Sequence, residues 1–308
     1  MGWQEINKSK YIEQIKKSLN LNNHEDILEK DLLLTLILAE FEKKGLGKDL
    51  IFKGGTLLSR NYLKYHRFSE DLDFVFKDSN AIRDLGRNPR ERKVKIFLDN
   101  FVPELKNVAD TLGLDFSTDR SNKKYCKMLS GRTVYTFKIY YSENKYIKVE
   151  INFVEKIIDT PKNTSVKAIT DFFDSKELLF SLGLNYQNFN VLNYSLKEIT
   201  LEKYRATLTR KKLQERDLFD LFLIKDSLKA DIGEIIEKIN NSSLIKTDLT
   251  SLITEKLDLL LKDKFFESEE KIEELAISSY EKKEFEYFKE KIKPILIDIC
   301  NKFLESNK

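Results

Sequence analysis

Alternating apolar and polar positions give the clearest structural signal in the chain, over residues 133–154. The alternation predicts two β-strands, at 133–141 and 146–153, joined by the turn Ser142–Asn144. Apolar side chains share one face of the second strand. Its opposite face carries Lys148, Glu150 and Asn152, because side chains alternate between the two faces of a strand.

Shorter patterns predict the other elements of the N-terminal half. Helical spacing of apolar residues predicts helices, while short apolar runs next to tight turns predict strands. Gly45 is a typical helix stop, and it follows the predicted helix Asp31–Lys44. The predicted elements are helices at Ile12–Leu21, Asp31–Lys44, Leu57–Lys64 and 91–112, and strands at Leu50–Phe52 and Leu72–Phe76.

The C-terminal half carries helical patterns almost throughout, and from about residue 166 we predict helix to the end of the chain. Ser195–Glu198 fits a capping box that opens a helix to about Leu213, and Arg216–Lys229 forms the next. Apolar stripes at 249–261 and 285–295 are typical of helices that face a core. The fold class is therefore α+β, with an α+β domain at 1–165 and a helical domain at 166–308.

Composition narrows the function classes. With 308 residues, of which 41% are hydrophobic, the chain has enough apolar material for a large packed core. Its 54 basic and 51 acidic residues leave a net charge of only +3, which excludes a strongly basic coat for nucleic acid. RNA binding would need local basic clusters. Candidates lie at Arg83–Lys93, at Lys123–Lys124 and at Arg132.

Cysteine content and hydropathy indicate the compartment. Two cysteines, Cys126 and Cys300, make neither a disulfide framework nor a zinc motif. The N-terminus lacks the pattern of a signal peptide, and the most apolar run, Leu32–Ala39, is too short to span a bilayer. We therefore expect a cytoplasmic protein that does not bind membranes.

Two glycines between a strand and a helix form the first candidate site. Gly54 and Gly55 would let backbone N–H groups approach a phosphate closely, and Thr56 would add a hydroxyl donor. The alternative is an ordinary strand-to-helix turn in which Thr56 caps the helix. The three residues by themselves do not decide between these interpretations.

Asp71 and Asp73 form the second candidate. They stand two residues apart at the start of a strand, so both side chains point to the same face. Two carboxylates this close repel each other, and a divalent cation such as Mg²⁺ would relieve the repulsion. Otherwise the pair is the solvated acidic edge of a strand.

Glu150, on the polar face of its strand, would complete a metal site of three carboxylates if that strand lies next to Asp71 and Asp73. If it does not, Glu150 is an exposed side chain that pairs with Lys148 or Lys138. The order of strands in the sheet decides between the two, and the sequence does not give that order.

Two adjacent predicted helices carry the fourth candidate. Lys203 and Arg210 are seven residues apart and share a helix face, and Asp217 opens the next helix. The two cations would hold a triphosphate, with Asp217 positioning them. The alternative is a solvated helix face with spaced ion pairs.

Taken together, these segments resemble a known family. The stretches Phe52–Leu57 and Arg67–Phe74 closely resemble the first motif of the AbiEii/AbiGii toxin family, which is nucleotidyltransferase-like and related to the MenT toxins. Residues 202–210 and Arg216–Leu221 resemble the family's downstream lysine and Arg-Asp-x-x-Asp motifs. Order and separation also agree. One departure is that Glu150 replaces the aspartate common in the wider superfamily.

The resemblance implies a DNA-polymerase-β-like nucleotidyltransferase domain with a mixed sheet, followed by a helical C-terminal region that adds Lys203 and Asp217 to the cleft. It implies that Asp71 and Asp73 bind Mg²⁺, with Mn²⁺ as a substitute, and that Lys203 holds phosphate beside Asp217. Glu150 would be a third metal ligand that helps to deprotonate the attacking hydroxyl. The residues in contact with the nucleotide would be Gly54, Gly55, Thr56, Arg67, Ser69 and Arg210.

The implied function is transfer of a nucleoside monophosphate (NMP) from a nucleoside triphosphate (NTP) to RNA. The expected acceptor is the 3′ end of tRNA, and the protein would act as the toxin of a toxin–antitoxin or abortive-infection system, silenced by a separate antitoxin. Alternatives are transfer to a protein hydroxyl and a module that binds NTP or RNA without catalysis. The full set of Asp71, Asp73 and Lys203 favours catalysis, because binding alone does not need it.

Overall fold

A computed structural model describes residues 2–21, 24–129, 131–172, 176–184, 188–226, 231–241, 246–267, 272, 276–277 and 281–307. The chain divides into two compact units. The first comprises Met1–Glu155 and Pro161–Tyr194, and the second comprises Lys156–Thr160 and Ser195–Lys308. The first unit is α+β and the second is helical, in agreement with the predicted fold class.

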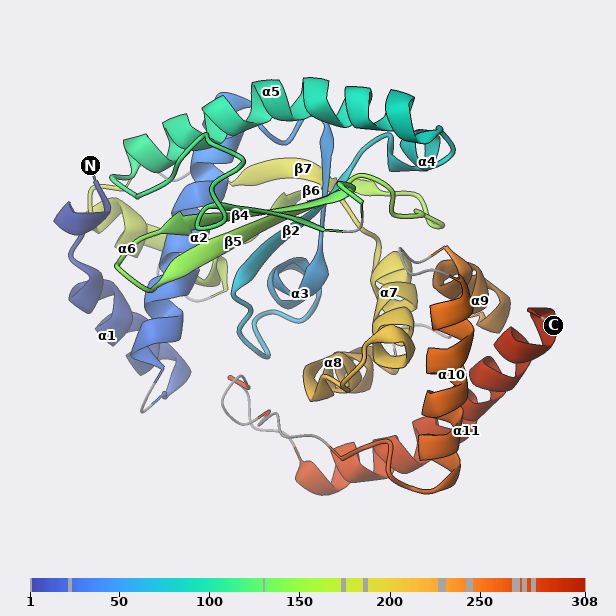
Figure 1. Cartoon of the computed structure of the whole chain (residues 1–308). Helices are drawn as coiled ribbons and strands as arrows, with labels where there is room; N and C mark the ends of the chain where they lie inside the picture. Colours follow the sequence, from blue (N-terminus) through green and yellow to red (C-terminus); the bar gives the residue numbers. More distant parts are fainter. Residues whose placement is uncertain are drawn as a thin grey trace. The chain divides into compact units, whose positions relative to one another are not determined.

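A seven-stranded mixed sheet forms the centre of the first unit, in the order β3-β4-β5-β2-β1-β7-β6 (Figure 1). The pairs β2–β5 and β1–β7 are parallel, and the other pairs are antiparallel. The predicted strands at 50–52, 72–76, 133–141 and 146–153 are confirmed. The strands are β1 Leu50–Lys53, β2 Asp71–Phe76, β3 Cys126–Leu129, β4 Val134–Tyr140, β5 Tyr146–Asn152, β6 Lys162–Val166 and β7 Phe189–Asn193.

Helices lie on both faces of this sheet; Figure 1 shows α5 along one face and α3 against the other. The long α2 ends at Gly45, which has a φ of +64° and donates its N–H to the carbonyl groups of Glu42 and Phe41, as its sequence predicts. The helical elements are η1 Trp3–Glu5, α1 Lys8–Leu19, α2 Glu25–Lys44, α3 Gly54–Leu57, η2 Leu58–Tyr62, α4 Ser79–Arg83, α5 Arg87–Thr111, η3 Ile169–Asp171 and α6 Lys176–Ser181.

Aromatic side chains fill the core between α2, α5 and the sheet. The Phe41 ring of α2 lies 6.0 Å from the ring of Phe74 on β2 and 6.2 Å from that of Phe101 on α5. On β5 the apolar side chains at 147, 149 and 151 are fully buried in this core. The alternate side chains of β5 are half-buried on the other face, which therefore remains for polar chemistry.

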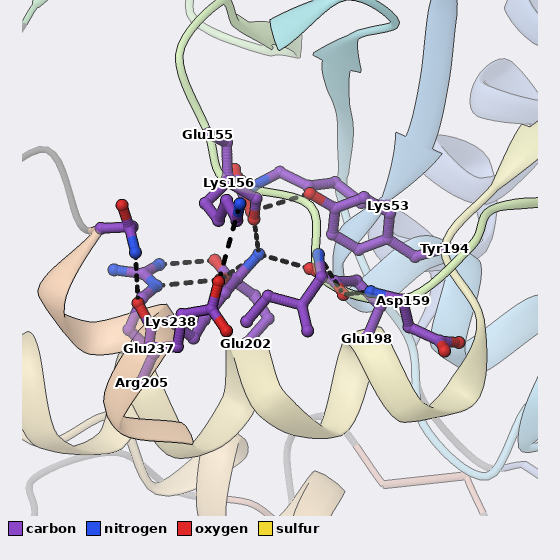
Figure 2. Close-up of polar contacts among 12 residues, drawn as sticks. Lys53, Glu155, Lys156, Asp159, Tyr194, Glu198, Glu202, Arg205, Glu237 and Lys238 are labelled. Atoms are coloured by element: carbon purple, nitrogen blue, oxygen red, sulfur yellow. Dashed lines mark hydrogen bonds and ion pairs between the residues drawn. The ribbon is translucent and has the colours of Figure 1, made fainter. Parts of the chain in front are cut away.

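The second unit consists of helices, and the segment 156–160 lies against the first of them. The Glu198 carboxylate of α7 accepts the N–H groups of Ile158 (3.0 Å) and Asp159 (2.7 Å) and pairs with the ammonium of Lys238 (2.6 Å; Figure 2). Ser195 caps α7 by accepting the N–H of Glu198, which is one half of the predicted capping box; the Glu198 carboxylate makes the contacts above in place of the other half. The helices are α7 Leu196–Thr209, α8 Glu215–Ile224, α9 Ile232–Asn240, α10 Lys246–Leu261 and α11 Lys282–Ser306.

The structure corrects the prediction of continuous helix after residue 166. The strand β7, at Phe189–Asn193, pairs in parallel with β1, so the sheet extends well beyond the expected boundary near 165, and the first unit continues to Tyr194. Five residues of alternation are a weak local signal, and β7 is stabilised by a partner strand far away in the sequence. The helix predicted to reach Leu213 ends at Thr209, and the helix predicted at Arg216–Lys229 spans Glu215–Ile224; residues 227–229 lie outside the described residues.

Among the residues that the structure describes, no helix combines the length and apolar character needed to cross a membrane.

Candidate active site

The turn from β1 into α3 has no room for side chains at its two glycines. Gly54 has a φ of +82°, and a Cβ atom there would lie 2.4 Å from Oδ2 of Asp73. A Cβ atom on Gly55 would lie 2.7 Å from Nη2 of Arg67 and 2.9 Å from Oγ of Ser69. Close approach therefore favours glycine at both positions, and it brings this backbone against three residues of the predicted site, Asp73, Arg67 and Ser69.

Thr56 holds this turn to the start of β2. Its buried hydroxyl donates a hydrogen bond to the carbonyl oxygen of Asp71 and lies 3.0 Å from Oγ of Ser69. Thr56 therefore does not cap the helix, since α3 begins two residues earlier. Arg67 is buried as well, and its guanidinium donates to the carbonyl oxygen of Phe68 at 2.6 Å.

The carboxylates lie on two neighbouring parallel strands. In the register of β2 and β5, Asp71 is opposite Lys148 and Asp73 is opposite Glu150. Paired residues project to the same face of a sheet, so the three carboxylates share the half-buried polar face. The sheet order that the sequence left open thus brings Glu150 next to Asp73.

Lys148 lies among these carboxylates. Its Nζ is 3.0 Å from Oδ2 of Asp71 and 3.9 Å from Oε2 of Glu150. The hydroxyl of Thr136, on β4, donates to the same Glu150 oxygen at 3.2 Å. Glu150 therefore lies beside the aspartates, as a third metal ligand would, and it also contacts Lys148, but its side chain is half-buried and not fully exposed.

The electrostatics of the cluster favour a positive charge. Burial raises the pKa of Asp73 from 3.8 to about 6; Lys148 opposes this rise, whereas Glu150 and Asp71 add to it. Burial alone would lower the pKa of Lys148, but the carboxylates of Asp73, Asp71 and Glu150 outweigh burial and raise it. One ammonium thus does not neutralise three carboxylates.

The three carboxylates are the type of ligand that a hard divalent cation binds, but their side-chain positions do not form a metal site. Within the described part of the chain, no three His, Cys, Asp or Glu side chains converge closely enough to hold a metal ion. Lys148 supplies the positive charge between Asp71 and Glu150. Three carboxylates on one face, with excess negative charge, are nevertheless the oxygen donors that Mg²⁺ prefers.

A buried group of polar residues adjoins the glycine turn. Lys53, which precedes Gly54, pairs with the carboxylate of Glu155. The same carboxylate accepts hydrogen bonds from the hydroxyl of Tyr194 (2.9 Å; Figure 2) and from Asn152 (3.2 Å). These contacts fix the end of β1, from which Gly54 follows.

In the helical unit, Lys203 of α7 lies against two buried carboxylates of α8. Its Nζ is 2.7 Å from Oδ1 of Asp217 and 2.6 Å from Oδ2 of Asp220. Arg210, just after α7, has its Nε 3.2 Å from the other oxygen of Asp217, and its side chain is 43% exposed. The structure thus brings the three predicted residues of this unit together, and the burial of Lys203 and Asp217 contradicts a solvated helix face.

Sequence reasoning missed Lys148 and Asp220 as members of these clusters. Lys148 stands two residues before Glu150, on the same strand face, so the alternation placed it there before the sheet order was known. Asp220 is the second aspartate of the Arg-Asp-x-x-Asp motif, one helical turn after Asp217. The sequence pairs Lys148 only with Glu150 and gives Asp220 no partner, so it does not show their contacts with Asp71 and Lys203.

A comparison with protein-family models agrees with the sequence resemblance. The family described as "Nucleotidyl transferase AbiEii toxin, Type IV TA system" matches residues 36–298. The nucleotidyltransferase toxin MenT4 from Mycobacterium tuberculosis is a structural relative with a TM-score of 0.46 and 14% sequence identity, over 94% of this chain and 98% of that one. No curated protein sequence matches the chain.

Proposed function

Because the chain belongs to the AbiEii family of nucleotidyltransferase toxins of type IV toxin–antitoxin systems, we propose that it transfers an NMP from an NTP to a hydroxyl group of RNA with the help of Mg²⁺. The observation that carries this proposal is the register of β2 and β5, with Asp71, Asp73 and Glu150 on one face beside the glycine turn. That arrangement supplies metal ligands and a base at the same place.

The proposed reaction is a single displacement at phosphorus. The acceptor oxygen forms a bond to the α-phosphorus, the bond from that phosphorus to the bridging oxygen breaks, and pyrophosphate leaves. Glu150 takes the proton of the attacking hydroxyl. Asp71, Asp73 and Glu150 would hold Mg²⁺, which would neutralise charge on the phosphates.

The protein's own groups would bind the triphosphate by charge and by backbone hydrogen bonds. The close packing of Gly54 and Gly55 lets their backbone approach phosphate oxygens, with Arg67 and Ser69 directly behind the turn. In the helical unit, Lys203 and Arg210 provide positive charge for phosphate, and Asp217 positions both. Thr56 contributes by holding the turn, since its hydroxyl is engaged within the fold.

The proposed acceptor is the 3′ end of tRNA, because modification there would block aminoacylation and stop growth, as expected of a toxin. The antitoxin would be a separate protein that silences this activity. Mn²⁺ would substitute for Mg²⁺, since both accept oxygen ligands.

The proposal is tested by incubating the protein with each α-labelled NTP, Mg²⁺ and total tRNA. We expect label in RNA with the wild type and none with Asp71→Asn. The matched control is Asp84→Asn, which makes the same chemical change at a side chain that is 73% exposed. This control should label RNA as the wild type does.

The possible outcomes separate the candidate functions. Label in protein and not in RNA would show that the acceptor is a protein hydroxyl, while NMP transfer would remain the reaction. NTP binding without label in any RNA or protein would contradict catalysis. Equal labelling by Asp71→Asn and the wild type would contradict the metal role of Asp71.

A further inference from the structure

Three tyrosines lie on the same sheet face as the candidate catalytic carboxylates. Tyr146 begins β5, two residues before Lys148 and four before Glu150, so it projects to the same face. Tyr140 of β4 is its register partner across the hairpin. Tyr125 precedes β3, and its carbonyl oxygen accepts the N–H of Lys138 in the same row.

The aromatic rings of these tyrosines form a continuous group. The ring centroids of Tyr140 and Tyr146 are 5.2 Å apart, and those of Tyr125 and Tyr140 are 5.8 Å apart. All three side chains are half-buried, so each ring is supported by the sheet and keeps part of its surface in solvent. We call Tyr125, Tyr140, Tyr146 and Lys138 the tyrosine surface.

Lysines lie over the rings. Nζ of Lys138 is 4.5 Å from the ring centroid of Tyr146, and Nζ of Lys124 is 4.6 Å from that of Tyr125 and 4.8 Å from that of Tyr140. Lys124 also pairs with Asp115 at 2.8 Å, so part of its charge is already balanced. Lys127 on β3 is exposed on this face as well. Lys124, Lys127 and Lys138 therefore outnumber Asp115, and the charge around the rings is positive.

This combination matches the chemistry of a single RNA strand. Bases stack on aromatic rings without regard to sequence, and lysines neutralise the phosphates between them. A base that stacks on Tyr146 would take the place of the Lys138 ammonium, which could then move to a phosphate. Tyr146 is about 13 Å along β5 from Glu150, a distance that one strand of a few nucleotides can bridge.

We propose that the tyrosine surface binds the single-stranded 3′ end of the acceptor RNA and directs its terminal hydroxyl toward Glu150. This inference rests on the proposed function and adds the acceptor-binding residues to it. The rings of Tyr140 and Tyr146 stack the bases that precede the terminal nucleotide, and Lys138 contacts their phosphates.

The test measures binding of a fluorescent single-stranded RNA octamer to the full chain by anisotropy, without NTP or metal. We expect Tyr146→Ala and Tyr140→Ala each to weaken binding about 5- to 100-fold, the range of one lost base stack. Tyr146→Phe should keep the affinity within twofold, because the ring remains. Lys138→Ala should weaken binding and make it less dependent on salt.

A second lysine-over-tyrosine pair provides the matched control. Nζ of Lys291 lies 4.5 Å from the ring centroid of the exposed Tyr287, both on α11 of the helical unit. Tyr287→Ala should bind the octamer as the wild type does. A double-stranded RNA should bind more weakly than the single-stranded RNA, because its bases are not free to stack on the rings.

The proposal is overturned if wild type does not bind the octamer at low salt, if Tyr146→Ala and Tyr140→Ala bind it unchanged, or if Tyr287→Ala loses as much affinity as they do. Tighter binding of the duplex would also overturn it. The proposed function fails separately. If wild type and Tyr146→Ala transfer labelled NMP to RNA equally, the proposed reaction is supported and the role of the tyrosine surface is contradicted. If the octamer binds the tyrosine surface but no NMP is transferred, the surface is supported and the proposed reaction is contradicted.

Discussion

Asp73 and Glu150 are direct neighbours in the parallel pairing of β2 with β5. This pairing brings together two carboxylates from distant parts of the sequence, and it adds Asp71 on the same face one repeat away. Burial raises the pKa of Asp73 to about 6, and the negative charges of Glu150 and Asp71 add to this rise. Carboxylates gathered in this way lower the stability of the folded state, and they are suited to binding a cation.

Glu150→Gln should slow NMP transfer without loss of folded protein. If Glu150 accepts the proton of the attacking hydroxyl, its amide should reduce kcat by about 100- to 10,000-fold, with little change in the KM for NTP. Steady-state kinetics with labelled NTP measures both constants. Glu143→Gln, at an exposed position in the turn of the same hairpin, should behave as wild type. A normal kcat in Glu150→Gln would remove this residue from the mechanism.

Gly54→Ala should damage the site more than its backbone conformation alone explains. At a φ of +82° the alanine costs about 1–2 kcal/mol, and its Cβ would in addition meet Asp73 Oδ2 at 2.4 Å. Gly131→Ala tests the first effect by itself, because Gly131 has a φ of +64° with open space around it. We expect urea denaturation to show a larger loss for Gly54→Ala. Equal losses in the two variants would contradict the contact with Asp73.

Asp73→Asn should stabilise the protein at neutral pH. The folded state raises the pKa of Asp73 to about 6, so it binds this proton more tightly than the unfolded chain does, and stability falls as the pH rises from about 4 to 6. The amide does not ionise, so we expect it to raise the free energy of unfolding at pH 7.5 by about 1–3 kcal/mol. The difference from wild type should shrink toward pH 4. A variant less stable than wild type at pH 7.5, or a difference independent of pH, would contradict this assignment.

Lys148→Gln should strengthen the binding of a divalent cation. The ammonium of Lys148, 3.0 Å from Asp71 Oδ2, repels any cation placed among the carboxylates. Because one charge at about 4 Å is worth about 1 kcal/mol even in water, we expect Mn²⁺ to bind at least about fivefold more tightly. Calorimetry at pH 8, where Asp73 is ionised, measures this affinity. Lys145→Gln, in the adjacent turn, should leave it unchanged, and weaker binding in Lys148→Gln would refute the competition.

Lys203→Met should destabilise the protein as well as impair nucleotide binding. The change removes the ammonium from the buried carboxylates of Asp217 and Asp220, which costs about 3–5 kcal/mol for a buried pair. Arg210→Met removes a more exposed charge and should cost less than about 1 kcal/mol. Thermal unfolding of both variants gives the comparison. If the two variants have the same Tm, the buried ion pairs of Lys203 contribute no more to stability than the exposed pair of Arg210.

The sequence by itself determined the local elements of the site. Alternation with a period of two placed Asp71 and Asp73 on the same face of one strand. It likewise placed Lys148 and Glu150 on the same face of a second strand, without knowledge of the fold. The stop at Gly45 and the cap at Ser195 were likewise local and are confirmed. Such features depend on backbone geometry and on neighbours a few residues away, and these are present in the sequence itself.

Only the tertiary structure decided which strands are neighbours. The pairing of β2 with β5 brings Glu150 to Asp73, and the pairing of β1 with β7 adds a strand where helix was predicted. These pairings join segments far apart in the chain, and their stability comes from the packing of whole strand faces and not from any short pattern. For the same reason, the ammonium of Lys148 between the carboxylates became visible only when the sheet was assembled.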